Sequence, residues 1–323
     1  MAKFLYPTFG AVNPIYQKVV NSFPSGMQMA FAYGSGVFHN RGKTNATQNV
    51  LDFMIVVDDP ISWHRQNIKQ NANHYSFLKM FGPNIISGLQ ESSAGLYFSP
   101  IVQFEDRFIK YSVINTVRLA EDLVQWRHLY ASGRLHKPVV MVKPPDDEGI
   151  QKALEINLRS AVHTSLMLLP ETFSEVDLFM QVASLSYTNE IRISFSDDEN
   201  KVKNIVNSGI DNFRVLYKPI LSSTEFLHWN EKKKSFEQEC DSKARRHHLN
   251  FIPENLLWGI TVNDVNNIED LKDNLANDSE CGIVVYDGVE QIVSQYSISQ
   301  SMKGLLTEGW SGAINKLHST RNK

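Results

Sequence analysis

Residues 31–38 read FAYGSGVF, in which two glycines flank Ser35 between bulky apolar side chains. The stretch does not match a P-loop. A dinucleotide-binding fingerprint would need a third glycine at His39, and the nucleophile elbow of a hydrolase would need a glycine at Tyr33. The stretch is therefore a small-residue turn whose role depends on its neighbours.

The next apolar run is LDFMIVV, residues 51–57, which is typical of a strand buried on both faces. Asp52 interrupts this run, and a carboxylate inside a buried strand needs a partner or a metal. Nucleotidyltransferases of the DNA polymerase beta type combine a Gly-Ser turn with a following strand that carries Asp-x-Asp/Glu. Such a turn lets backbone N–H groups approach a triphosphate, and the carboxylates hold Mg²⁺. Because Met54 replaces the second carboxylate, a structural turn beside a core strand remains the alternative.

Composition limits the possible classes of protein. The chain has 323 residues, of which 42% are hydrophobic and 21% charged, as expected for a globular protein of two domains. A net charge of -3 gives no overall attraction to nucleic acid. Cys240 and Cys281 lack metal-ligand spacing and fit a reducing compartment. No run is long enough to span a bilayer, and no cleavable presequence is visible.

Hydrophobic periodicity predicts the other elements. We expect helices over 61–81, 116–133, 149–169 and 173–187, and strands over 95–103, 107–114 and 213–217. We also expect a linker at 142–149 (VKPPDDEG), an exposed basic segment at 231–248, and a loop with a solvated helix at 264–280.

Several blocks occur together in the order and spacing of one family. They read FAYGSGVF, LDFMIVVDDP, WHRQNIKQNANHYS, IKYSVI, LYASGRLHKPV, LSYTNEIR and QSMKGLLTEGW. From about residue 20 to its C-terminus the chain resembles the mitochondrial translocator assembly and maintenance family, whose members are CDP-diacylglycerol synthases (phosphatidate cytidylyltransferases).

The resemblance implies a function and a fold. It implies Mg²⁺-dependent formation of CDP-diacylglycerol and pyrophosphate from CTP and phosphatidic acid, for cardiolipin and phosphatidylglycerol synthesis. It implies an α/β (α+β) fold with a polymerase-beta-like nucleotidyltransferase domain over 1–145. A helical, winged-helix-like domain would follow at 146–230, and a C-terminal region at 231–323 would meet the anionic inner membrane from the matrix side. No nucleic-acid partner is expected.

The resemblance also assigns roles within the first domain. Gly34, Ser35 and Gly36 would bind the triphosphate, with a tight turn as the structural alternative. Asp52 would bind Mg²⁺, the alternative being a buried acid paired with a basic side chain. Lys110 would reach a nucleotide phosphate or form a salt bridge with Asp52.

LSYTNEIR matches the family pattern Ser-Tyr-x-Gly-Asp-x-Arg with two changes, Asn189 for glycine and Glu190 for aspartate. We carry over Tyr187, Glu190 and Arg192 as site residues. Glu190 would supply the catalytic, metal-binding carboxylate that Met54 lacks, and Arg192 would contact a phosphate. Lys201 and Lys203 are further phosphate candidates, with a solvated basic face as the alternative.

Two other patterns come from helical spacing. Asn67 and His74 share a face with Trp63 and Asn71, which suits hydrogen bonding to a nucleotide or, equally, a structural polar network. His247-His248 follows basic residues and is expected to be exposed. A C-terminal helix would lie on the membrane with one apolar side, made by Leu306, Trp310, Ile314 and Leu317. Docking of that helix on the domain core is the alternative.

Two other functions remain open at this level. The chain could transfer a nucleotide to a protein or to a soluble acceptor. It could instead be a non-catalytic scaffold for protein import at the inner membrane, which would be consistent with the loss of a carboxylate at Met54.

Overall fold

The computed structural model describes residues 6–7, 9, 13–34, 37, 50–92, 94–187, 195–259 and 267–295, without the side chains of 195–201 and 259. The chain forms two compact units that alternate along the sequence. Unit 1 comprises residues 1–7, 121–138 and 152–295, and unit 2 comprises 8–120, 139–151 and 296–323. The expected boundaries at 145 and 230 differ from this division, because the strand near residue 140 returns to unit 2.

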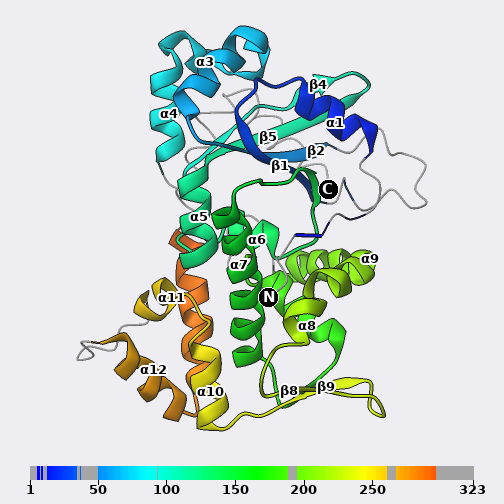
Figure 1. Cartoon of the computed structure of the whole chain (residues 1–323), viewed down its shortest axis with the longest axis vertical. Helices are drawn as coiled ribbons and strands as arrows, with labels where there is room; N and C mark the ends of the chain where they lie inside the picture. The colour runs from blue at the N-terminus through cyan, green and yellow to red at the C-terminus, as the bar shows by residue number, and fades with distance from the viewer. Residues whose placement is uncertain are drawn as a thin grey trace. The chain divides into compact units, whose positions relative to one another are not determined.

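Unit 2 is built on a mixed β-sheet (Figure 1). In its described part the strands follow the order β3-β5-β2-β1-β6, and β4 pairs with β5. Strand β1 is antiparallel to β2 and β6, whereas β2 and β5 run parallel. The strands are β1 (Met27–Tyr33), β2 (Leu51–Val57), β3 (Leu96–Phe98), β4 (Val102–Phe104), β5 (Arg107–Asn115) and β6 (Val140–Lys143).

One face of this sheet is covered by helices. Alternate residues of β2, such as Phe53 and Ile55, pack with Val19 and Trp63 of the helical layer in one buried cluster. Because side chains alternate across a strand, Asp52 and Met54 belong to the opposite face. The helical layer contains α1 (Pro14–Asn21), α3 (Pro60–Gln70) and α4 (Pro83–Glu91), with the 3₁₀ turns η1 (Ala72–His74) and η2 (Phe77–Phe81).

Unit 1 is mainly helical, and its described part includes a small sheet in the order β7-β9-β8. Stacked rings of Phe179, Phe213 and Tyr217 join α8 to α9. The remaining elements are α5 (Thr116–Gln125), which crosses the boundary between the units along the chain, α6 (Ala131–Leu135), α7 (Glu148–Leu168), β7 (Thr172–Phe173), α8 (Glu175–Ser184), α9 (Phe195–Leu221), β8 (Leu227–Asn230), β9 (Ser235–Gln238), α10 (Ser242–Leu249), α11 (Glu254–Gly259), α12 (Ile268–Asn277) and a helix over 281–295.

Most long periodic segments were predicted correctly, including the strand at 51–57 and the helices now seen as α7 and α8. The helix expected over 61–81 ends at Gln70, and the 3₁₀ turns η1 and η2 follow it. The helix expected over 116–133 ends at Gln125, and Trp126 has a positive φ of 51°. The Asp122 carboxylate accepts hydrogen bonds from the N–H groups of the following turn, which stabilises that turn instead of further helix.

Three other expectations were wrong. Residues 213–217 belong to α9, because Phe213, Leu216 and Tyr217 are buried at helical spacing. The proposed linker 142–149 contains the end of β6, and Asp147 accepts a hydrogen bond from Ile150 N as α7 begins. The basic segment 231–248 contains β9 and α10 and is only partly exposed.

The acidic segment at 264–280 contains α12 in its described part, and Leu271 and Leu275 are buried. Among the described helices, none combines the length and apolar character needed to cross a membrane.

Candidate active site

A row of polar side chains crosses three neighbouring strands of unit 2. Tyr33 on β1 pairs with Asp52 on β2, and Asp52 pairs with Lys110 on β5. Directly paired residues of adjacent strands project to the same face, so the phenol, carboxylate and ammonium groups are neighbours there. All three residues are partly exposed, while the flanking Leu51 is buried. The row brings together two of the predicted site residues, Asp52 and Lys110.

Gly34 follows β1 directly and lies beside the Asp52 carboxylate. Its φ is +86°, a conformation that favours glycine, and a Cβ added there would stand 3.4 Å from Oδ2 of Asp52. The backbone of the glycine turn and the strand carboxylate therefore approach each other closely, as the sequence predicted. This arrangement leaves backbone groups close to the carboxylate without an intervening side chain.

The next row of paired residues along the same face is buried. Met54 pairs with Phe31 and Ser112, and all three are almost completely buried. The position of the missing second carboxylate is thus filled by packed apolar side chains. Asp58 lies beyond the end of β2, where its carboxylate accepts a hydrogen bond from Thr116 Oγ1 at 2.6 Å. It holds the start of α5 and does not belong to the row with Asp52.

Asp52 is suited to bind a divalent cation, because its carboxylate is partly exposed beside a small turn. Lys110 is the residue of β5 that pairs with Asp52. Its ammonium group suits contact with a phosphate group bound next to the divalent cation. The Nζ atom of Lys110 lies 5.8 Å from the centre of the Phe98 ring on β3.

Several predicted site residues lie outside the described part of the chain. These are Ser35, Gly36, Glu190 and Arg192, the side chain of Lys201, and the membrane residues Leu306, Trp310, Ile314 and Leu317. Lys203 is described and is exposed on α9.

Asn67 and His74 do not belong to the same face of the sheet as Asp52. The Asn67 amide is fully buried and donates to the hydroxyls of Tyr75 and Tyr111, at 3.0 and 2.9 Å. His74 is buried against the Tyr111 ring. Since Tyr111 is part of the helix-covered cluster, we assign Asn67 and His74 to the core of unit 2 and not to a nucleotide site. Their contacts match the structural polar network that was the alternative for this pair.

The same polar network contains His64, whose two ring nitrogens contact Tyr75 Oη at 2.8 Å and Gln90 Oε1 at 2.9 Å. Burial lowers the pKa of His64 to about 4, so the ring is neutral near pH 7. A neutral, hydrogen-bonded histidine in the core has a structural role.

In unit 1, the segment 133–137 meets residues 186 and 187, the described end of the LSYTNEIR block. A Cβ added to Gly133 would lie 2.3 Å from the Ser186 side chain, so only glycine permits this approach. Lys137 is 8% exposed, donates to Ser186 Oγ at 2.8 Å, and lies 4.7 Å from the centre of the Tyr187 ring. A buried lysine next to a predicted site tyrosine is a functional candidate that sequence reasoning missed. The family block contained Lys137, but no periodic pattern marked it as buried.

Comparison with known proteins adds a direct observation. The family model described as "Phosphatidate cytidylyltransferase, mitochondrial" matches residues 16–323. The chain belongs to this family. The resemblance inferred from the sequence blocks is therefore confirmed.

Curated relatives of the phosphatidate cytidylyltransferase family extend across vertebrates and yeast. The chain is 40% identical to the mitochondrial phosphatidate cytidylyltransferase of Danio rerio over 302 residues, covering 91% of this chain and 89% of that one. It is 39% identical to the human protein, covering 91% and 67%, and 36% identical to the Schizosaccharomyces pombe protein, covering 90% and 79%. A solved nucleotidyltransferase-like protein from Exiguobacterium sibiricum covers 90% of this chain and 76% of its own, at 11% identity and a TM-score of 0.23. That likeness is too slight to support an argument.

Proposed function

We propose that this chain is a phosphatidate cytidylyltransferase, which makes CDP-diacylglycerol and pyrophosphate from CTP and phosphatidic acid. A phosphate oxygen of the lipid would form a bond to the α-phosphorus of CTP, and the bond from that phosphorus to the oxygen that bridges the α- and β-phosphates would break, so that this oxygen leaves with pyrophosphate. The observation that carries the proposal is the family match over nearly the whole chain. The row of Asp52 and Lys110 beside Gly34 supports it, because the reaction needs positioned charge more than covalent help.

Asp52, Lys110 and the glycine turn each have a role in the proposal. Asp52 holds Mg²⁺, which when bound would neutralise phosphate charge and help align the reacting oxygens. Lys110 contacts a phosphate, and the bare backbone at Gly34 admits the triphosphate close to Asp52. Ser35 and Gly36 extend this turn, and Glu190 supplies a second carboxylate in place of Met54.

The proposal also keeps the nucleotide-binding candidates that occur later in the sequence. Tyr187 and Arg192 bind the nucleotide, with Lys203 and Lys201 as weaker phosphate ligands. Lys137 supports Tyr187 through the contact between its ammonium group and the phenol ring. We place the winged-helix-like domain here, supported by the element order α7-β7-α8-α9-β8-β9 and the strand order β7-β9-β8.

The enzyme must reach a lipid, so we also propose peripheral contact with the anionic inner membrane from the matrix side. The amphipathic segment 301–323 is one contact. A surface of unit 2 is a second, because Phe77, Met80, Phe81 and Ile85 are all more than half exposed. The surrounding residues 60–90 carry Arg65, Lys69 and Lys79 but no carboxylate, and that charge favours an anionic bilayer.

An activity assay tests the reaction. We expect labelled CTP, phosphatidic acid vesicles and Mg²⁺ to yield CDP-diacylglycerol, and Asp52→Asn to lower kcat/KM at least a hundredfold, since the substitution removes the cation ligand. Asp106→Asn, at an exposed site between β4 and β5, is the matched control and should retain activity. Removal of Mg²⁺ by a chelator should abolish turnover, and its restoration should recover it.

The same reagents separate the two rival functions. Wild-type protein that ignores the lipid and modifies a soluble or protein acceptor would overturn the choice of substrate. Equal rescue of growth by wild type and Asp52→Ala, in cells that lack the enzyme, would favour the non-catalytic scaffold.

Membrane contact has a separate measurement. We expect deletion of 301–323 to reduce flotation with phosphatidic-acid vesicles while CTP binding is kept. In the full chain, Met80→Ser/Phe81→Ser should weaken flotation, whereas Val215→Ser, at an exposed position on α9, should not. Unchanged flotation in both altered proteins would contradict these contacts.

A further inference from the structure

Three histidines of unit 1 come together. His163 is on α7, and His247 and His248 are on α10. One ring nitrogen of each lies within 4.8 Å of a ring nitrogen of both others. Within the part of the chain that the structure describes, this is the one such group of histidine, cysteine or acidic side chains. The expectation that His247-His248 is exposed was wrong for His248, because that ring packs between α10 and α7.

Two of the rings are deeply buried, and only one nitrogen of each forms a hydrogen bond among the described residues. His163 is 1% exposed and His248 is 2% exposed. Their Nδ1 atoms lie 2.9 Å apart, so an N–H of one ring donates to the other. The Nε2 atom of each ring has no hydrogen-bond partner among the described residues. Two buried imidazoles that contact each other through their Nδ1 atoms are an unusual feature of a core, where polar side chains are normally paired with other kinds of groups.

Burial also keeps these rings in the form that binds metals. Desolvation lowers the pKa of His163 to about 2, and the neighbouring histidines add to this effect. Desolvation likewise lowers the pKa of His248 to about 4. Neutral imidazoles with available lone pairs are the preferred ligands of Zn²⁺ and related metals.

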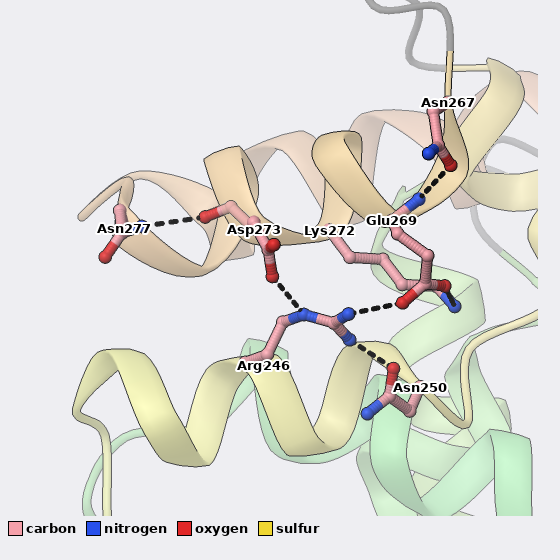
Figure 2. Close-up of polar contacts among 7 residues, drawn as sticks. All are labelled: Arg246, Asn250, Asn267, Glu269, Lys272, Asp273 and Asn277. Carbon is pink, nitrogen blue, oxygen red and sulfur yellow. Dashed lines mark hydrogen bonds and ion pairs between the residues drawn. The ribbon is translucent and has the colours of Figure 1, made fainter.

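The two helices that carry the rings are firmly connected. Ser160 on α7 donates to the carbonyl of Phe251 at 2.8 Å, and the Phe251 ring stacks on His163 at 4.2 Å between centres. Figure 2 shows how Arg246, the residue before His247, bonds Glu269 and Asp273 of α12. Because both ends of the cluster are held by such contacts, the histidines are positioned before any ligand arrives.

Among nearby charges, the Arg159 guanidinium disfavours a cation at His163, but it is partly neutralised. The Arg159 guanidinium is paired with Glu155 at 3.2 Å, which offsets its positive charge. The Glu225 carboxylate lies 3.9 Å from Nδ1 of His247, where it can orient that ring and balance part of the charge of a bound ion.

We propose that His163, His247 and His248 form a zinc site that is separate from the proposed Mg²⁺ site at Asp52. In tetrahedral coordination, Zn–N bonds of about 2.0–2.1 Å place ligand nitrogens about 3.3 Å apart. Ring nitrogens within 4.8 Å of one another therefore need to converge by about 1.5 Å at most. Binding replaces the hydrogen bond between the Nδ1 atoms by two metal–nitrogen bonds, and a tautomeric shift in one ring keeps both rings neutral. A water molecule completes the fourth position.

Metal titration of the full-length protein tests the site. After treatment with a chelator and its removal, we expect one equivalent of Zn²⁺ to bind, measured against a competing indicator. His247→Ala, at the half-buried ring, should weaken binding at least tenfold without loss of the fold. His228→Ala, which removes an exposed histidine on β8, is the matched control and should leave binding unchanged. Asp52→Asn should also keep the zinc, which separates this site from that of Mg²⁺.

Cobalt provides a second readout that does not depend on a folding-sensitive variant. Co²⁺ bound to wild-type protein should give the strong visible absorption of a tetrahedral site, and Zn²⁺ should displace it. Absence of this absorption, or zinc binding that His247→Ala leaves unaltered, would overturn the proposal. Both results are independent of cytidylyltransferase activity.

Discussion

At the residue scale, Gly34 has the clearest physical requirement. Its φ of +86° disfavours any side chain, and the Asp52 carboxylate occupies the space next to it. Gly26 has a φ of +91° but nothing within 4 Å of an added Cβ. A comparison of substitutions at the two glycines therefore separates the effect of backbone strain from the effect of proximity to the proposed site.

We predict that Gly34→Ala and Gly26→Ala each lower the free energy of unfolding by about 1 kcal/mol, because both place an alanine at positive φ. Gly34→Ala alone should reduce kcat/KM for CTP, by about tenfold or more, since its methyl group approaches Asp52. Thermal unfolding and steady-state kinetics measure the two effects. Wild-type kinetics in Gly34→Ala would show that the turn does not bind the triphosphate.

At the scale of elements, α10 shows that a basic segment can be partly buried and can contact another helix. The basic composition of 231–248 suggested a solvated surface. In the structure Arg245 Nε donates to the carbonyl of Ala276 at 2.7 Å, and Arg246 bridges α10 to α12 (Figure 2). The basic residues of α10 thus hold α10 and α12 together, because their acidic partners come from a segment more than twenty residues later.

We predict that Arg246→Ala lowers the free energy of unfolding of the protein by about 1 kcal/mol, because a partly buried network with several partners is lost. Lys234→Ala removes an exposed pair with Glu231 in the β8–β9 turn and should have little effect. Chemical denaturation of the three proteins provides the comparison. Equal stability of wild type and Arg246→Ala would mean that the Arg246 contacts are energetically neutral.

At the scale of the whole molecule, buried neutral histidines make stability depend on pH. In the folded protein, burial lowers the pKa of His64 to about 4 and that of His136 to about 3, against 6.5 for the unfolded chain. Below pH 6.5 the unfolded state binds protons that the folded state does not. The stability that these neutral histidines contribute is therefore fully present above pH 6.5, and it decreases as the pH falls toward their pKa values in the folded protein.

We predict that lowering the pH from 7 to 5 costs about 2 kcal/mol for His64 alone. His64→Gln should reduce the pH dependence of the unfolding temperature by that contribution, and His228→Gln, at an exposed site, should not. An unfolding temperature that shows no change between pH 7 and 5 would contradict the assignment of these histidines as neutral.

Sequence reasoning was strongest where a pattern is local. A near-continuous apolar run identified β2 and its interrupting Asp52, and helical periodicity identified α7 and α8. The strand prediction failed at 213–217, where the β-prone Phe213, Val215 and Tyr217 belong to a 27-residue helix whose buried stripe sets the outcome. It also failed beyond Gln125, where hydrogen bonds to the Asp122 carboxylate stabilise a turn.

By itself, the sequence determined the family, because its blocks occur in a specific order along the chain. It also predicted the glycine turn and the strand carboxylate beside it, because each is marked by a local pattern. Only the tertiary structure decided which polar groups share a face. It separated Asn67 from Asp52 across the sheet, placed Lys137 against Tyr187, and brought His163 to His248, 85 residues away. Such pairings depend on how distant elements pack, and no periodicity in the chain encodes that packing.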